Sequence, residues 1–196
     1  LTRAPLPPHV GPYDHMAIHP YPSTLLTHFQ PPRGNPITLR PITPQDAALE
    51  QDFVQRLSPQ SRYFRFMNSL RELSPVQLAR STQIDYDHEM ALIATTPDDS
   101  TGLTRQIGEA RYATNPDGIS CEFAIAVADD WQGQGLAQHM MKTLIDIARK
   151  HPRLKTMHGD FLNDNQRMLT FVEHLGFTTA AHPQENGMKR GTLPLK

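Results

Sequence analysis

A polar, glycine-containing loop between an apolar segment and a helical segment carries the clearest chemical signal in the sequence. The apolar run Phe123–Ala128 ends in the loop Asp129–Gly135, and small residues then open a helical stretch over 134–150. Small residues let backbone N–H groups approach a ligand, and a helix N-terminus offers unpaired donors and partial positive charge. The loop therefore suits a phosphate or a pyrophosphate.

Three interpretations of this loop compete. It could be a glycine turn that binds nothing. It could be a dinucleotide-binding loop, but Gln138 occupies the third glycine position after Gly133 and Gly135, and three strands precede it. The third interpretation rests on the spacing Gln132-x-x-Gly135-x-Ala137, whose family resemblance is given below.

Glu122 is the candidate catalytic residue, because it is the lone charge at the start of the apolar strand. A protonated nucleophile must lose its proton before it can attack a substrate. A carboxylate in a partly dry site can take that proton, directly or through water. The alternative role for Glu122 is a surface salt bridge. Cys121 should point to the opposite face and belong to the core.

A mostly acidic cluster precedes the next candidate strand upstream. Asp85, Asp87 and Glu89, with His88 among them, could recruit a lysine or supply a second base on the substrate side. The alternative is a solvated strand entry whose aspartates cap turns. A further group could line an acceptor groove, or could be core aromatics with arginines at their rim: Arg62, Tyr63, Phe64, Arg65 and Phe66.

Periodicity and turn signals predict the elements that position these residues. Strands are expected at 37–42, 90–95, 106–113, 119–128, 154–162, 177–181 and 188–195. Helices are expected from Pro44 to Leu57, over 59–67, from Pro75, over 134–150, and from a cap at Asn163 or Asp164 to Gly176. The strand at 119–128 reads as buried on both faces. This order predicts a mixed α/β layer.

Residues 1–36 differ from the rest, because they hold nine of the 18 prolines. Proline disfavours regular helices and central strands, so we expect a linker or extended arm with one short turn at 23–29, and a folded domain over 37–196. Four histidines lie here, at 9, 15, 19 and 28, but their spacing fits no zinc site, and we expect no metal.

Composition excludes several functions. Lys and Arg number 19 against 20 for Asp and Glu, so a basic nucleic-acid surface is not expected. No apolar run approaches the roughly 20 residues of a membrane span. The single cysteine rules out an intramolecular disulfide and fits the cytoplasm. Because the first residue is Leu, the chain is expected to be a piece of a longer protein.

The spacing Gln132-x-x-Gly135-x-Ala137 resembles the acyl-CoA signature, Arg/Gln-x-x-Gly-x-Gly/Ala, of the GNAT superfamily of N-acetyltransferases. Asn165 to Met168 and Leu175-Gly176-Phe177 strengthen the resemblance, which covers 37–196. It implies an α/β (α+β) fold with a mixed, mostly antiparallel sheet of about six to seven strands flanked by helices. It also implies acetyl-CoA as cosubstrate, bound at a splayed strand pair, with no metal.

The same resemblance implies roles for single residues. The backbone of Ile125 and Val127 would bond the pantetheine arm, and Asn165 would contact the cofactor. Many members have a tyrosine six residues after this Asn that can protonate the leaving thiolate, but here the position is Phe171; Tyr86 and Tyr112 are the unplaced alternatives. The pyrophosphate would lie on the backbone N–H groups of Gln132, Gly133, Gln134, Gly135, Leu136 and Ala137.

Three further segments resemble the acetyltransferase domain of Pat-type bacterial protein lysine acetyltransferases: 84–91, 61–66 and His19–Pro22. The last resembles the joint that follows an acyl-CoA-synthetase-like region. The resemblance implies acetylation of a protein lysine, with AMP-forming acetyl-CoA synthetase as the expected target. Acetylation of a small amine and a non-catalytic acyl-CoA-sensing module are the alternatives.

Overall fold

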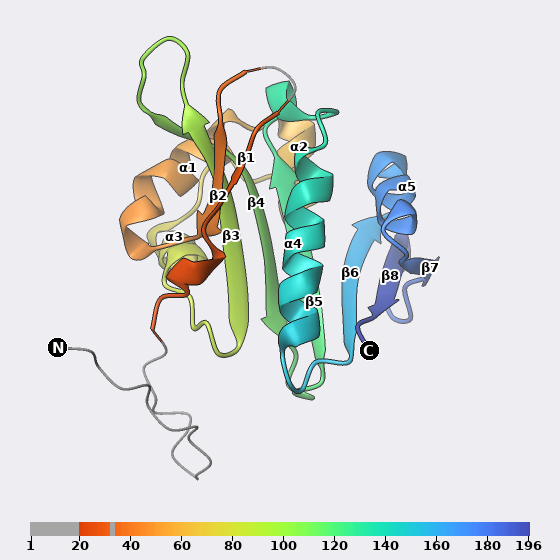
Figure 1. Ribbon diagram of the computed structural model, residues 1–196. Helices are drawn as coiled ribbons and strands as arrows, with labels where there is room; N and C mark the ends of the chain where they lie inside the picture. The colour runs from red at the N-terminus through yellow and green to blue at the C-terminus, as the bar shows by residue number, and fades with distance from the viewer. Residues whose placement is uncertain (1–19, 32–33) are drawn as a thin grey trace, which may run out of the picture.

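The computed structural model describes residues 20–31 and 34–196, which form one sheet with helices on both faces (Figure 1). The strands are β1 (Thr27–Phe29), β2 (Ile37–Pro41), β3 (Glu89–Pro97), β4 (Thr104–Thr114), β5 (Ser120–Val127), β6 (Thr156–Leu162), β7 (Thr178–Ala181) and β8 (Met188–Pro194). The helices are α1 (Ala47–Arg56), α2 (Pro59–Phe66), α3 (Pro75–Thr82), α4 (Leu136–Lys150) and α5 (Gln166–His174). The predicted mixed α/β fold is confirmed.

The sheet has eight strands in the order β1-β2-β3-β4-β5-β6-β8-β7. Every neighbouring pair is antiparallel except β5 and β6, which are parallel. The mostly antiparallel sheet is therefore as expected, and the parallel pair lies at its centre. The helix α4, which connects the two parallel strands, is the crossover that such a pair requires.

Helices α1 and α3 lie on one side of the sheet and α4 crosses the other, while α5 packs against β7 and β8 (Figure 1). The apolar stripe predicted for 134–150 anchors α4: Leu136, Met140 and Leu144 are fully buried, and Ile147 is partly buried against the core. Burial of each such side chain contributes about 2 kcal/mol before entropic costs. The stripe thus fixes the helix whose N-terminus follows the glycine loop.

The expectation of six to seven strands was one too low, because β1 lies inside the segment predicted as a linker. Thr27 to Phe29 fall between the prolines and pair with β2 at the edge of the sheet, where neighbouring prolines do no harm. The ring of Phe29 stacks on His139 of α4, with centroids 4.8 Å apart. His9, His15 and His19 lie outside the described residues.

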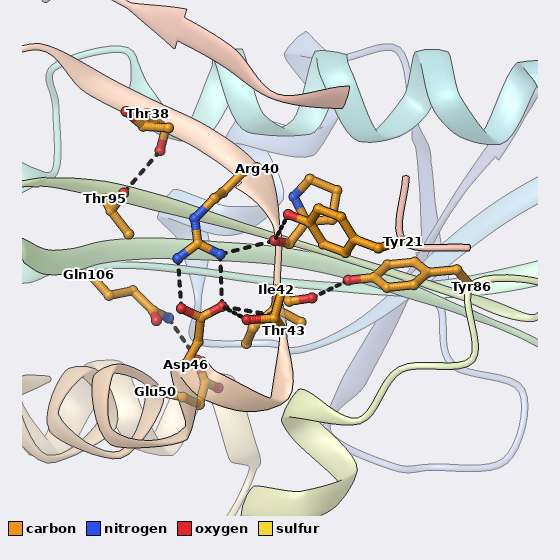
Figure 2. A network of polar contacts seen from close by, with 11 residues as sticks. Tyr21, Thr38, Arg40, Ile42, Thr43, Asp46, Glu50, Tyr86, Thr95 and Gln106 are labelled. Atoms are coloured by element: carbon orange, nitrogen blue, oxygen red, sulfur yellow. Dashed lines mark hydrogen bonds and ion pairs between the residues drawn. The ribbon is translucent and has the colours of Figure 1, made fainter. Parts of the chain in front are cut away.

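A polar network fixes the turn between β2 and α1 (Figure 2). The Arg40 guanidinium donates two bonds to Asp46, at 2.7 and 2.6 Å, and the Thr43 N–H donates a third at 2.8 Å. Burial alone would raise the pKa of the Asp46 carboxyl, but Arg40 and Thr43 outweigh it and lower that pKa. The Tyr86 hydroxyl donates to the Ile42 carbonyl in the same network. These contacts therefore stabilise the fold of the domain.

Candidate active site

The central parallel pair separates after a short contact. β5 and β6 pair only from Ser120 to Glu122 on one strand and from Thr156 to His158 on the other. Beyond Glu122, β5 pairs with β4 alone, and beyond His158, β6 pairs with β8 alone. We call the end of this pairing, at Glu122 and His158, the β5–β6 fork. It opens a wedge whose walls carry backbone groups without strand partners.

The direction of those backbone groups follows from the bonds at both ends of β5. Ala128 N–H donates to Ile107, and Ser120 accepts from Asn115, so the even-numbered residues of β5 bond to β4. The odd-numbered residues therefore direct their N–H and C=O groups into the wedge. Ile125 and Val127 are among them, as their predicted role on pantetheine requires. That role itself stays a prediction.

The side chains of β5 alternate between the two faces, contrary to the expected burial on both. Cys121, Phe123, Ile125 and Val127 are buried on the α4 side, whereas Glu122 is exposed. The second face is open because it borders a cavity. Burial raises the pKa of the Cys121 thiol to about 12, so Cys121 is a core residue and no nucleophile.

The glycine loop is preorganised at the N-terminus of α4. Gly133 and Gly135 have φ of 76° and 82°, a left-handed conformation that only glycine adopts at low cost. No atom lies within 4 Å of where a Cβ would stand at either residue. The first N–H groups of α4 have no partner within the helix. The loop thus offers donors in open space, and it fits the pyrophosphate of an acyl-CoA.

Side chains tie this loop to its surroundings through contacts that sequence spacing did not reveal. The Gln132 amide donates to the Val127 carbonyl at 3.1 Å and accepts from Arg167 of α5 at 2.9 Å. Gln134 donates to the Asp130 carbonyl instead of facing the cavity. Arg167 is a residue that sequence reasoning missed, since nothing near it in the chain marks it as a partner of Gln132.

Asp129, the first residue of the loop, binds the N-terminal end of α2, whose N-cap is Ser58. Its carboxylate accepts from the Ser58 N–H at 2.8 Å, from the Ser58 hydroxyl at 2.8 Å and from the Ser61 hydroxyl at 2.7 Å. Burial would raise the pKa of Asp129, but these bonds outweigh it and lower that pKa. This carboxylate beside the helix N-terminus holds α2 against the loop.

Two buried carboxyl groups and two half-buried arginines, the buried ion cluster, hold α2 and α1 on β4. Glu109 accepts from Arg65 of α2 and from Arg111, each at 2.7 Å, and Glu50 of α1 lies 3.6 Å from Arg111. Burial and the charge of Glu109 raise the pKa of Glu50 to about 8. Glu109 is also buried, but its two arginines outweigh burial and lower its pKa. The cluster places Arg65 at a cavity wall.

A cavity of about 770 Å³ lies between α2, β5, the glycine loop, β6 and the start of α5. Gln134 and Leu136 do not line it. Leu136 is buried in the core, and the Gln134 side chain bonds to the Asp130 carbonyl instead. The other predicted catalytic and cofactor residues do line it: Glu122, Ile125, Val127, Gln132, Gly133, Gly135, Ala137 and Asn165. The structure therefore brings the base candidate and the phosphate loop to one cavity.

Asn165 lines this cavity while capping α5. Its Oδ1 accepts from the Met168 N–H at 3.2 Å, so the cap is Asn165, not the expected Asn163 or Asp164. The predicted contact of Asn165 with the cofactor would have to come from its remaining amide donor.

The aromatic and arginine residues of α2 divide between two roles. Phe64, Arg65 and Phe66 line the cavity. Arg62 instead donates to the carbonyls of Gln55 and Leu57, at 2.7 and 2.6 Å, and so joins the end of α1 to α2. Three of the five residues predicted for an acceptor groove thus line the cavity, and their role toward an acceptor stays a prediction.

None of the three substrate-side candidates lines the cavity. Asp85 accepts from the Asp87 N–H and from His88 in a tight turn, at 3.1 and 2.9 Å. Glu89 lies on β3 opposite Ala113, whose other neighbour is Glu122, so it shares a face with Glu122 two strands away. Burial raises the pKa of Glu89. A role in recruiting the acceptor stays a prediction for all three.

The two tyrosines considered as proton donors lie elsewhere. Tyr86 belongs to the network of Figure 2, and Tyr112 is buried on the α4 side, where burial raises its pKa to about 12. Phe171 does line the cavity, where its ring can pack but cannot donate. Among the described residues, the cavity wall contains no tyrosine.

Residues 20–31 and 34–196 contain no group of three or more His, Cys, Asp or Glu side chains that could hold a metal ion. They also contain no helix with the length and apolarity to cross a bilayer.

Comparison with known proteins agrees with this geometry. The family model described as Acetyltransferase (GNAT) domain matches residues 37–178. A Pseudomonas aeruginosa protein named Acetyltransferase PA5475 is 35% identical over 153 residues, which cover 78% of this chain and 81% of that protein. Acetyltransferase Pat of Mycolicibacterium smegmatis is 26% identical over 70% of this chain, and the match spans only 40% of that longer protein.

A solved structure shows the same fold. The crystal structure of the GNAT domain of S. lividans PAT superposes with a TM-score of 0.79. The sequences are 24% identical, and the match covers 89% of this chain and 99% of that one.

Proposed function

The chain belongs to the GNAT acetyltransferase family and is an acyl-CoA-dependent N-acetyltransferase; from that premise we propose that it acetylates a lysine side chain of another protein, with acetyl-CoA as donor and Glu122 as general base. The observation that carries this proposal is the position of Glu122 at the β5–β6 fork, exposed to the cavity on which the phosphate loop also opens.

The donor side of the cavity would hold the acyl-CoA through backbone groups. The N–H groups at the start of α4 would bind the pyrophosphate, and the wedge-facing groups of Ile125 would bond the pantetheine arm as a strand would. The Val127 carbonyl already accepts one bond from Gln132, so its N–H is the group of this residue left wholly for the ligand. This arrangement would direct the thioester toward the β5–β6 fork.

The acceptor side supplies the proton chemistry. The amine nitrogen would attack the thioester carbonyl carbon, the C–S bond would break, and CoA would leave. The proton of the ammonium form would pass to the Glu122 carboxylate, directly or through water. As the C–S bond breaks, the amide nitrogen would lose its second proton. Since Phe171 cannot relay it, this proton would reach the CoA sulfur through water, or pass to solvent while CoA leaves as thiolate.

Two lines of support favour a protein lysine over a small amine. The segments 61–66 and 84–91 resemble Pat-type enzymes, and two of the matched proteins carry the name Pat. AMP-forming acetyl-CoA synthetase is the target that this resemblance implies, and fusion to an acyl-CoA-synthetase-like region in the full-length protein is part of the same proposal.

A thiol-release assay with acetyl-CoA tests the proposal. One arm offers AMP-forming acetyl-CoA synthetase, a second a panel of polyamines, aminoglycosides and amino acids, and a third no acceptor. The proposal expects CoA release with the protein, and a lysine of that protein acetylated by mass spectrometry. Release with small amines alone would assign a small-molecule acetyltransferase. Binding of CoA without release in any arm would assign a sensing module.

A further inference from the structure

His158 is the side chain next to Glu122 across the last rung of the parallel pair. The two residues are register partners on β6 and β5, at the β5–β6 fork. Partners in a parallel pair project to the same face of the sheet, so the imidazole and the carboxylate lie side by side. Glu122 faces the cavity, whereas His158 is half-buried behind it.

A chain of hydrogen bonds fixes the tautomer of His158. The Ser120 hydroxyl gives its single hydrogen to Asp117 at 2.6 Å, so it can only accept from the Asn115 amide, 2.8 Å away. The nitrogen of that amide must therefore face Ser120, and the same nitrogen lies 2.8 Å from His158 Nε2. Nε2 consequently accepts, and in the neutral ring the proton sits on Nδ1.

The Nδ1 atom of His158 lacks a hydrogen-bond partner among the described residues. It is also buried. A buried donor without an acceptor costs about 1 to 3 kcal/mol, so such an atom calls for a ligand or a role.

The charges around His158 favour its neutral form. Burial lowers its pKa, and Arg190 of β8 adds to that effect. Three carboxylates act in the opposite direction without overcoming it: Glu122 on β5, Asp160 on β6 and Asp117 in the turn before β5. Asp160 is already engaged in two 2.7 Å bonds from Arg190. The ring is thus held as a neutral donor beside Glu122.

We propose that His158 is a positioning residue for Glu122: when an acceptor fills the cavity, its Nδ1–H donates to the Glu122 carboxylate and aims the opposite oxygen at the amine. This inference rests on the proposed function. Hydrogen bonds of catalytic groups commonly tighten only in the substrate complex, which accounts for an exposed Glu122 in the free protein. The bond would leave His158 uncharged throughout, while Glu122 accepts the proton.

Two substitutions separate positioning from packing. An asparagine amide nitrogen can overlay Nδ1 and a glutamine amide nitrogen can overlay Nε2, so His158→Asn keeps the donor that His158→Gln removes. With the acceptor identified in the thiol-release assay, we expect His158→Gln to lower kcat about 10- to 100-fold and His158→Asn to lower it about threefold or less. The KM for acetyl-CoA should change in neither.

The pH profile supplies a readout that a packing defect would not move. A donor to the carboxylate favours its charged form. The acidic limb of kcat, which reports the pKa of Glu122 in the substrate complex, should therefore shift to higher pH in His158→Gln and stay in place in His158→Asn. Nitrogen NMR of the wild-type imidazole should show Nδ1 protonated, with a shift change in Glu122→Gln. This last measurement stands even if His158→Gln does not fold.

The outcomes distinguish this inference from the proposed function. Absence of turnover in the wild type with every acceptor defeats the proposed function. An active wild type and an inactive Glu122→Gln, with His158→Gln retaining the wild-type kcat and acidic limb, would overturn the positioning role alone. A wild-type imidazole protonated on Nε2 would overturn it as well.

Discussion

Replacing Gly135 with alanine tests whether the loop before α4 is a phosphate site. At φ of 82° an alanine costs about 1 to 2 kcal/mol relative to the right-handed regions. No atom lies within 4 Å of the added Cβ, so no clash adds to this cost. Alanine also restricts the unfolded chain more than glycine does, which offsets about 0.4 to 1 kcal/mol of this cost. The net loss of stability is therefore about 1 kcal/mol.

Binding of CoA should carry a larger penalty than stability. The loop of the free variant can avoid the cost of alanine at positive φ by leaving the left-handed conformation. Binding of CoA then carries that cost, because the ligand needs the original loop geometry. The new methyl group would also occupy space in front of the helix N-terminus. Since 1.4 kcal/mol corresponds to tenfold in affinity, we expect Gly135→Ala to raise the Kd for CoA about tenfold or more.

The chain offers a matched control. Gly187 has φ of 85°, and again nothing lies within 4 Å of its Cβ position, but it sits in the turn before β8 and does not line the cavity. Gly187→Ala should lose about 1 kcal/mol of stability in urea unfolding and keep the wild-type Kd. Trp131 is the single tryptophan and lines the cavity, so its fluorescence can report CoA binding. Equal CoA affinity in the two variants would refute the assignment of the loop.

Two further predictions concern buried carboxylates. The pKa of the Glu50 carboxyl is raised to about 8 in the folded state, so the folded protein favours the protonated side chain. The stability that this proton contributes is fully present below about pH 4.5 and is lost as the pH rises through 8. Glu50→Gln should therefore come close to the wild type in urea unfolding at pH 5 and exceed it by about 3 to 4 kcal/mol at pH 8; a variant less stable at both values would contradict the burial argument. Asp129→Ala should cost about 1 to 2 kcal/mol, since Ser58 and Ser61 at the start of α2 lose their bonds to the carboxylate. The loss should shrink below pH 4, as the pH falls toward the lowered pKa of Asp129 and the wild type protonates. An equal loss at pH 3 and pH 7 would count against this role of the carboxylate.

Local signals predicted most of the fold. The strand expected at 90–95 is β3 at Glu89–Pro97, and the helix expected at 134–150 is α4 at Leu136–Lys150, because periodic burial leaves a clear pattern in the chain. β1 was missed because three residues between prolines carry no periodicity. Its place in the sheet depends on β2, which lies ten residues away.

The candidate site was predicted only where its residues are neighbours in the sequence. The loop from Gln132 to Ala137 and the position of Glu122 were visible in the spacing. The contacts of Asp129 with Ser58 and of Arg167 with Gln132 join segments 71 and 35 residues apart, so no local sequence pattern could predict them. The role proposed for His158 could not be predicted for the same reason, since its pairing with Glu122 exists only in the folded sheet.

The most direct test of the account is the rate of acetyl transfer to the accepted substrate by the wild type and by Glu122→Gln, at saturating acetyl-CoA. A positioned general base contributes about 10²- to 10⁴-fold. The account therefore predicts a loss of at least about 100-fold in kcat, with an unchanged Kd for CoA measured through Trp131. Equal rates in the two proteins would show that Glu122 is not the base and would contradict the account at its centre.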